Sequence, residues 1–88
     1  MPRLYKIAIH GNKIAEENLN IIPDEWRVNI LQFTVETVHI PYKGEWVINH
    51  KATCLFRGLR EDARRMGLLF LGMGYSVNVF VLAEEEIF

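Results

Sequence analysis

The chain has 88 residues, of which half are apolar and 24% are charged, and its formal net charge is −1. This length fits one domain, residues 1–88, and the composition excludes a disordered chain and a globally basic nucleic-acid binder. No apolar run reaches the roughly 18 residues of a transmembrane helix, and the single cysteine, Cys54, cannot form an internal disulfide. We therefore expect a cytoplasmic domain that does not bind membranes.

Residues 4–10 predict a first strand, because apolar and less apolar side chains alternate along them. Residues 13–31 fit more than one structure. Asn12 is a candidate cap for a short helix that would end at Pro23. Beyond Pro23, a second short helix and the beginning of a strand both fit, since β-branched residues become frequent from Val28 onward.

Residues 31–40 and 45–56 predict a β-hairpin. The breaker at residues 41–44 separates two alternating runs. A loop with an even number of residues, either Lys43-Gly44 alone or all of residues 41–44, places the apolar positions of both strands on one face. The residues expected on that inward face are Leu31, Phe33, Val35, Thr37, Trp46, Ile48, Ala52, Cys54 and Phe56.

Residues 59–73 predict an amphipathic helix that ends at Gly72 or Gly74, and Gly67 predicts close packing against the sheet. Residues 75–83 predict a strand that is apolar on both faces, as central or doubly covered strands are. An acidic run, residues 84–86, follows it. The aromatic and methionine side chains expected in the core are Phe33, Phe56, Met66 and Phe70.

The order of these elements predicts an α+β fold: a small antiparallel sheet with a central β-hairpin and one main helix. A ferredoxin-like β-α-β-β-α-β order fits this pattern best. If residues 13–31 are irregular, an antiparallel α+β fold with one main helix still results.

The sequence contains no recognisable catalytic constellation. Cys54 lies on the expected inward face, where a thiol is inert, and Ser76 begins a strand instead of a sharp turn. His39 and His50 are expected to be diagonal neighbours in the hairpin, but together with His10 they lack the spacing of a metal motif. We therefore expect no enzymatic activity, no metal site and no cofactor.

Four arginines form the one asymmetric feature of the sequence. Residues 51–65 hold five basic and two acidic residues, a net charge of +3, so the remainder of the chain carries −4. One interpretation is an exposed surface on which Glu61 pairs with neighbouring arginines. The other is a patch that binds a partner or an anion, since guanidinium groups form bidentate contacts with carboxylate and phosphate. The four arginines are Arg57, Arg60, Arg64 and Arg65, of which the first three have the i, i+3, i+7 spacing of a helical stripe.

These features predict a non-enzymatic interaction protein that binds a larger protein partner and modulates or inhibits it. The alternative is a nucleic-acid or anionic-ligand-binding module that uses the arginine-rich helix face. We also expect a homodimer, because a sheet with helices on one side leaves Phe80 and Leu82 of the last strand uncovered. The competing explanation is that residues 13–31 wrap across this second face.

Overall fold

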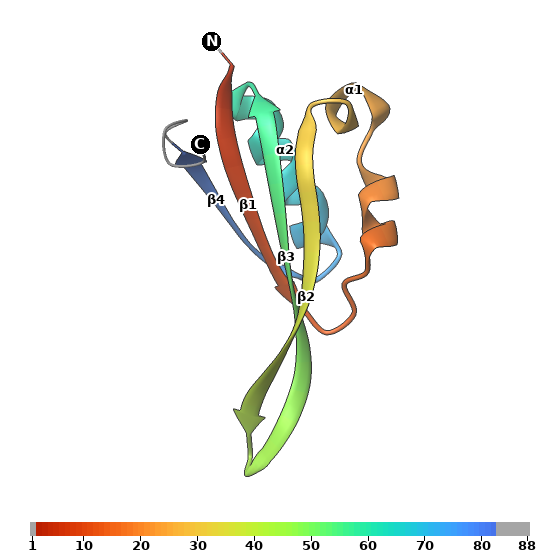
Figure 1. The fold of residues 1–88 in the computed structure, drawn as a ribbon, viewed down its shortest axis with the longest axis vertical. Helices are drawn as coiled ribbons and strands as arrows, with labels where there is room; N and C mark the ends of the chain where they lie inside the picture. Colours follow the sequence, from red (N-terminus) through yellow and green to blue (C-terminus); the bar gives the residue numbers. More distant parts are fainter. Residues whose placement is uncertain (1, 83–88) are drawn as a thin grey trace.

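A computed structural model describes residues 2–82, apart from the side chain of Glu16. The four strands form one sheet in the order β2-β3-β1-β4, with antiparallel neighbours throughout (Figure 1). The chain is therefore an α+β protein with one main helix, as predicted. The elements along the chain are β1 (Arg3–Gly11), the 3-10 helix η1 (Glu16–Ile21), α1 (Asp24–Arg27), β2 (Ile30–Tyr42), β3 (Glu45–Gly58), α2 (Arg60–Gly72) and β4 (Ser76–Leu82).

The predicted hairpin is present, and its turn has two residues. Tyr42 lies opposite Glu45, which leaves Lys43 and Gly44 as the turn. Both have a positive φ, 52° and 80° respectively. This is the geometry of a type I′ turn, whose twist matches that of the strands it joins. The even loop is therefore confirmed in the shorter of its two forms.

A β-bulge at the beginning of β2 changes one expected inward position. The register shifts between Ile30 and Gln32, so Ile30 lies opposite Phe56 and packs against the core. Leu31 was expected on the inward face with Phe33, and this prediction was wrong: Leu31 is exposed. The extra residue of a bulge moves the alternation by one position, which a strict period of two does not reveal.

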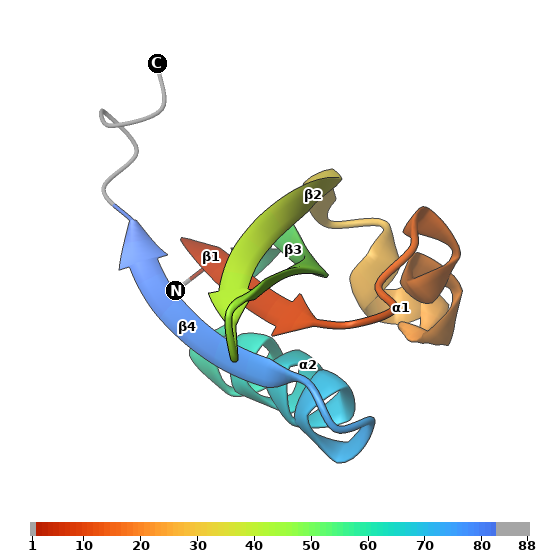
Figure 2. The same ribbon diagram turned by 90° about the horizontal axis from the view of Figure 1, so that it is seen from below.

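One face of the sheet carries the main buried cluster, and Leu4 and Ala8 are buried on the opposite face. α2 packs mainly on β4 and β1, and η1 lies beside β2 (Figure 2). Of the predicted core residues, Phe56, Met66 and Phe70 are fully buried, and Phe33 is half-buried and packs against them. The buried cluster consists of Tyr5, Ile7, Ile9, Ile14, Ile22, Ala52, Cys54, Phe56, Ala63, Met66 and Phe70.

Helix α2 is close to the predicted range and ends where a glycine permits it. Gly74 directly follows the C-cap residue and has a φ of +91°, a backbone conformation that residues other than glycine rarely adopt. Gly67 is buried at the contact with β4. A Cβ there would lie 3.1 Å from Val79 Cγ2 and 3.3 Å from Val77 Cγ1. The predicted close-packing role of Gly67 is therefore confirmed.

Strand β4 lies at an edge of the sheet, not at its centre. Val77 and Val79 lie on the face that packs against α2, while Phe80 on the other face is 48% exposed. The strand is apolar on both faces although only one of them is covered by a described element. The expectation that it is central was therefore wrong.

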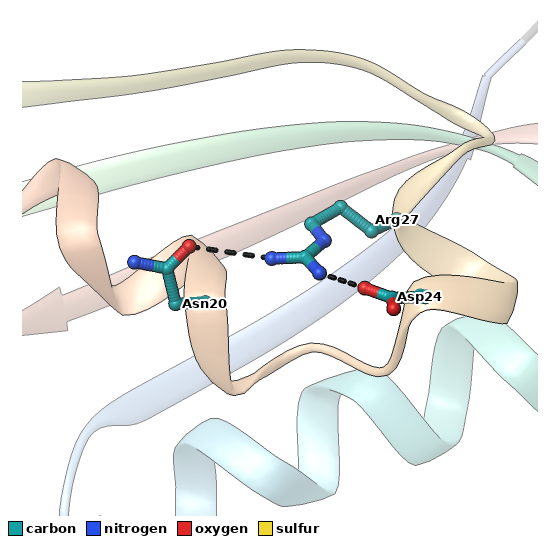
Figure 3. Close-up of polar contacts among 3 residues, drawn as sticks. All are labelled: Asn20, Asp24 and Arg27. Atoms are coloured by element: carbon teal, nitrogen blue, oxygen red, sulfur yellow. Dashed lines mark hydrogen bonds and ion pairs between the residues drawn. The ribbon is translucent and has the colours of Figure 1, made fainter.

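The segment between β1 and β2 forms two short helices, one on each side of Pro23, which is one of the alternatives that the sequence left open. Asn12 does not cap η1, because the residue at that position is Ala15. Arg27 of α1 donates a hydrogen bond of 3.2 Å to Asn20 Oδ1, which links α1 to η1, and it also forms an ion pair with Asp24 within α1 (Figure 3).

The same segment packs on the helix-covered face of the sheet. Ile14 and Ile22 are buried in the cluster that also holds Phe70 of α2. The explanation in which residues 13–31 cover the second face was therefore wrong. Among the described residues, no helix lies over the face that carries Phe80.

Candidate functional site: an arginine pocket

Three arginines from two parts of the chain, β1 and α2, line one pocket. It has a volume of about 470 Å³ and lies between β1, β4 and the first two turns of α2. The i, i+4 spacing places Arg60 and Arg64 on one flank of α2. The residues that line the pocket are Arg3, Tyr5, Arg60, Arg64, Val79 and Val81. We call this site the arginine pocket.

The sheet register explains how residues of β1 and β4 come to line the arginine pocket. Tyr5 lies opposite Val81 in the antiparallel ladder, so their side chains share a face. Arg3 is two residues before Tyr5 and therefore lies on that face too. This is the face that α2 covers. The pocket consequently has apolar strand residues at its base and guanidinium groups on two sides.

The structure divides the four predicted arginines. Arg60 and Arg64 line the pocket, whereas Arg65 pairs with Glu61 at 2.8 Å on the exposed surface of α2. Arg57 lies on β3, before the helix begins, so the predicted stripe that joined it to Arg60 does not exist. Since Arg57 follows the buried Phe56 along the strand, it belongs to the opposite face of the sheet.

Arg3 is a member of the pocket that sequence reasoning missed. The sequence shows that Arg3 shares a face with Tyr5. It does not show that β1 pairs with β4, and this pairing brings Arg3 to the same pocket as Val79 and Val81. Strand neighbours that are far apart in the sequence are set by tertiary packing.

The pocket is positively charged. Within residues 2–82, no ion pair or hydrogen bond involves the side chains of Arg3, Arg60 or Arg64. Guanidinium groups stay protonated at all physiological pH values. The pocket therefore presents three positive charges beside exposed Val79 and Val81, an arrangement that suits a carboxylate or a phosphate attached to an apolar group.

The nucleophilic and metal-binding candidates from the sequence lie elsewhere. Cys54 is buried, and desolvation raises the pKa of its thiol from 9.0 to about 12, which leaves the thiol protonated. His50 Nδ1 accepts a hydrogen bond of 3.2 Å from the Ile14 N–H. His39 lies opposite Ile48, so it is a diagonal neighbour of His50, as predicted. In residues 2–82, no group of three or more His, Cys, Asp or Glu side chains could hold a metal ion.

No protein-family model matches the chain, and no curated protein matches its sequence. None of the helices within residues 2–82 has the length and apolarity needed to cross a bilayer.

Proposed function

We propose that this chain is a non-enzymatic interaction protein that binds a larger protein partner and modulates or inhibits it. The observation that carries this proposal is the arginine pocket. Arg3, Arg60 and Arg64 converge there without an acidic partner among the described residues. The pocket takes an acidic segment of the partner, whose carboxylates pair with the guanidinium groups while its apolar side chains contact the exposed valines.

The distribution of the arginines favours a protein over a nucleic acid. A nucleic-acid backbone is held by a continuous basic stripe that neutralises several phosphates. Here Arg65 is neutralised by Glu61, and Arg57 belongs to the other face of the sheet. One compact pocket with an apolar base remains, and this shape suits a few acidic side chains better than a phosphate chain.

The test compares two double variants of equal charge. Arg60→Glu with Arg64→Glu alters the pocket, and Arg27→Glu with Arg65→Glu alters two arginines that are ion-paired outside it. Each immobilised protein is used for affinity capture from the native host, and bound proteins are identified by mass spectrometry. We expect the pocket variant to lose a partner that both the wild type and the control retain. Equal capture by all three proteins would contradict the proposal.

Titrations with two probes separate the classes of partner. One probe is a labelled peptide of alternating Glu and Val, and the other is a labelled single-stranded DNA of 20 nucleotides. We expect the peptide to bind the wild type and not the pocket variant. DNA that binds more tightly than the peptide, with a steep loss of affinity as salt rises, would instead support the nucleic-acid alternative.

We also propose two finer points of architecture. The strand order, with η1 and α1 in the place of a first helix, is interpreted as a ferredoxin-like β-α-β-β-α-β arrangement. The protein acts as a homodimer, because covering its exposed large apolar side chains with a second copy is favourable. Sedimentation equilibrium tests the dimer, and a mass of 10.3 kDa at every concentration would contradict it.

A further inference from the structure

The outer half of the β2–β3 hairpin extends beyond the rest of the sheet. β1 ends at Gly11, opposite His50, so residues 38–49 pair only with one another. We call residues 38–49 the arm. It accounts for the elongated shape of the molecule, which measures 47 × 27 × 18 Å (Figure 1). A two-stranded ribbon alone is at best marginally stable in water, so a surface that covered the arm would stabilise it.

The arm is apolar although none of its residues is buried. Trp46 is 73% exposed, Tyr42 60% and Ile48 56%. Its only charged residues are Lys43 and Glu45, which give the arm no net charge. Trp46 and Ile48 have the inward alternation predicted from the sequence, but the core does not extend to them. An exposed apolar surface of this kind is typical of an interaction site.

Pro41 affects the outer edge of β2 in the arm. Pro41 lies opposite Trp46, and without an N–H it cannot form a hydrogen-bonded ladder pair. Its nitrogen therefore points to the outer edge of β2, where it interrupts the donors that an added strand would need. In a pair without hydrogen bonds the two side chains lie close together. Pro41 thus makes the β2 edge of the arm a poor site for strand addition, and the face that holds Trp46 and Ile48 offers large exposed apolar side chains instead.

We propose that this face of the arm is the contact surface of the homodimer, with the arms of two copies packed against each other about a two-fold axis. The inference rests on the homodimer proposed above and names its interface. The face carries no carboxylate, ammonium or guanidinium group, so it needs no partner of opposite charge, and one patch can serve both copies. Its residues are His39, Pro41, Trp46 and Ile48.

The size of the face sets the expected strength of the dimer. Five ladder pairs beyond His50 make an arm of about 17 Å, at about 3.4 Å a residue. Stable interfaces bury about 800 Å² on each partner, which one face of a short ribbon does not reach alone. We therefore expect a reversible dimer with a dissociation constant in the micromolar range.

Sedimentation equilibrium between about 5 and about 500 µM tests this inference. The average mass of the wild type should rise from 10.3 kDa toward twice that value. Trp46→Lys with Ile48→Lys should stay monomeric, and circular dichroism should show that it is folded, because neither side chain touches the core. The control is Phe80→Lys on the sheet face opposite α2, which should dimerise like the wild type.

The outcomes distinguish failure of the dimer from failure of the interface. A wild type that stays at 10.3 kDa overturns both proposals. If the dimer persists in the arm variant but is lost in Phe80→Lys, the proposed contact through the arm is wrong. The contact then lies on the sheet face that carries Phe80. As a second readout, Trp26→Phe leaves Trp46 as the only tryptophan. Its emission should shift to shorter wavelength as concentration rises, and an unchanged spectrum across the transition would overturn the proposed contact.

Discussion

The ring of Phe70 on α2 stacks on the ring of Phe33 on β2, with centroids 6.4 Å apart and an interplanar angle of 26°. This contact joins the helix to the edge strand farthest from β4. Phe70 also lies 6.4 Å from the ring of Tyr75, which follows the helix. The side chain of Phe70 therefore connects the C-terminal half of α2 to β2 and to the residue that precedes β4.

Phe70→Ala should lower the free energy of unfolding by about 3–5 kcal/mol, because it removes a fully buried ring and leaves a cavity. That is a large part of the stability of a domain of this size. Leu71→Ala is the matched control, since Leu71 is adjacent and exposed and should cost less than about 1 kcal/mol. Urea denaturation followed by circular dichroism measures both. A cooperative Phe70→Ala variant that loses under 1 kcal/mol would contradict the packing described.

Alanine at the two glycines of α2 should have different effects. Gly72→Ala has nothing within 4 Å of the new Cβ and should stabilise the helix by up to about 1 kcal/mol. Gly67→Ala gains the same helix propensity, but its new methyl group presses on the methyl groups of Val77 and Val79. We therefore expect this variant to be less stable than Gly72→Ala. Thermal unfolding of both variants provides the comparison. An equal rise in unfolding temperature in both variants would show that β4 accommodates the extra methyl group without loss of stability.

The Cys54 thiol should make stability depend on pH in the alkaline range. Burial raises its pKa from 9.0 to about 12, so above pH 9 the unfolded chain loses a proton that the folded chain keeps. Stability should therefore fall as pH rises from about 9 to about 12, by at most about 1.4 kcal/mol per pH unit. Urea titrations across this range measure the slope, and Cys54→Ala should reduce it. An equal slope in both proteins would contradict the assignment.

Lys43→Asn should stabilise the turn of the arm by about 0.5–1 kcal/mol, because asparagine tolerates the positive φ of this position better than lysine does. Lys43→Val is the contrasting variant, since a β-branched residue is strained there. Amide hydrogen exchange of residues 38–49 measures the effect locally. The Asn variant should slow exchange and the Val variant should accelerate it. The same exchange rates in both would mean that the turn does not limit the stability of the arm.

Local patterns in the sequence determined the main elements. The alternation on both sides of residues 41–44 is sufficient for the hairpin and its even loop. The helical spacing that ends at Gly74 is sufficient for α2. Both depend on neighbours within a few residues, so a single sequence contains the information. The bulge at Leu31 and the two short helices before β2 were not determined, because packing on the sheet and not local preference selects them.

The two proposed binding surfaces depend on the tertiary structure. The cluster of arginines was visible in the sequence, but its division was not: Arg60 and Arg64 turn toward β4, Arg65 pairs with Glu61, and Arg3 joins from β1. Likewise, the apolar alternation of the hairpin predicts a buried face, and only the end of β1 leaves the arm exposed. Periodicity shows which side chains share a face. Which element lies against that face depends on strand order and length, and these are set by contacts between residues far apart in the chain.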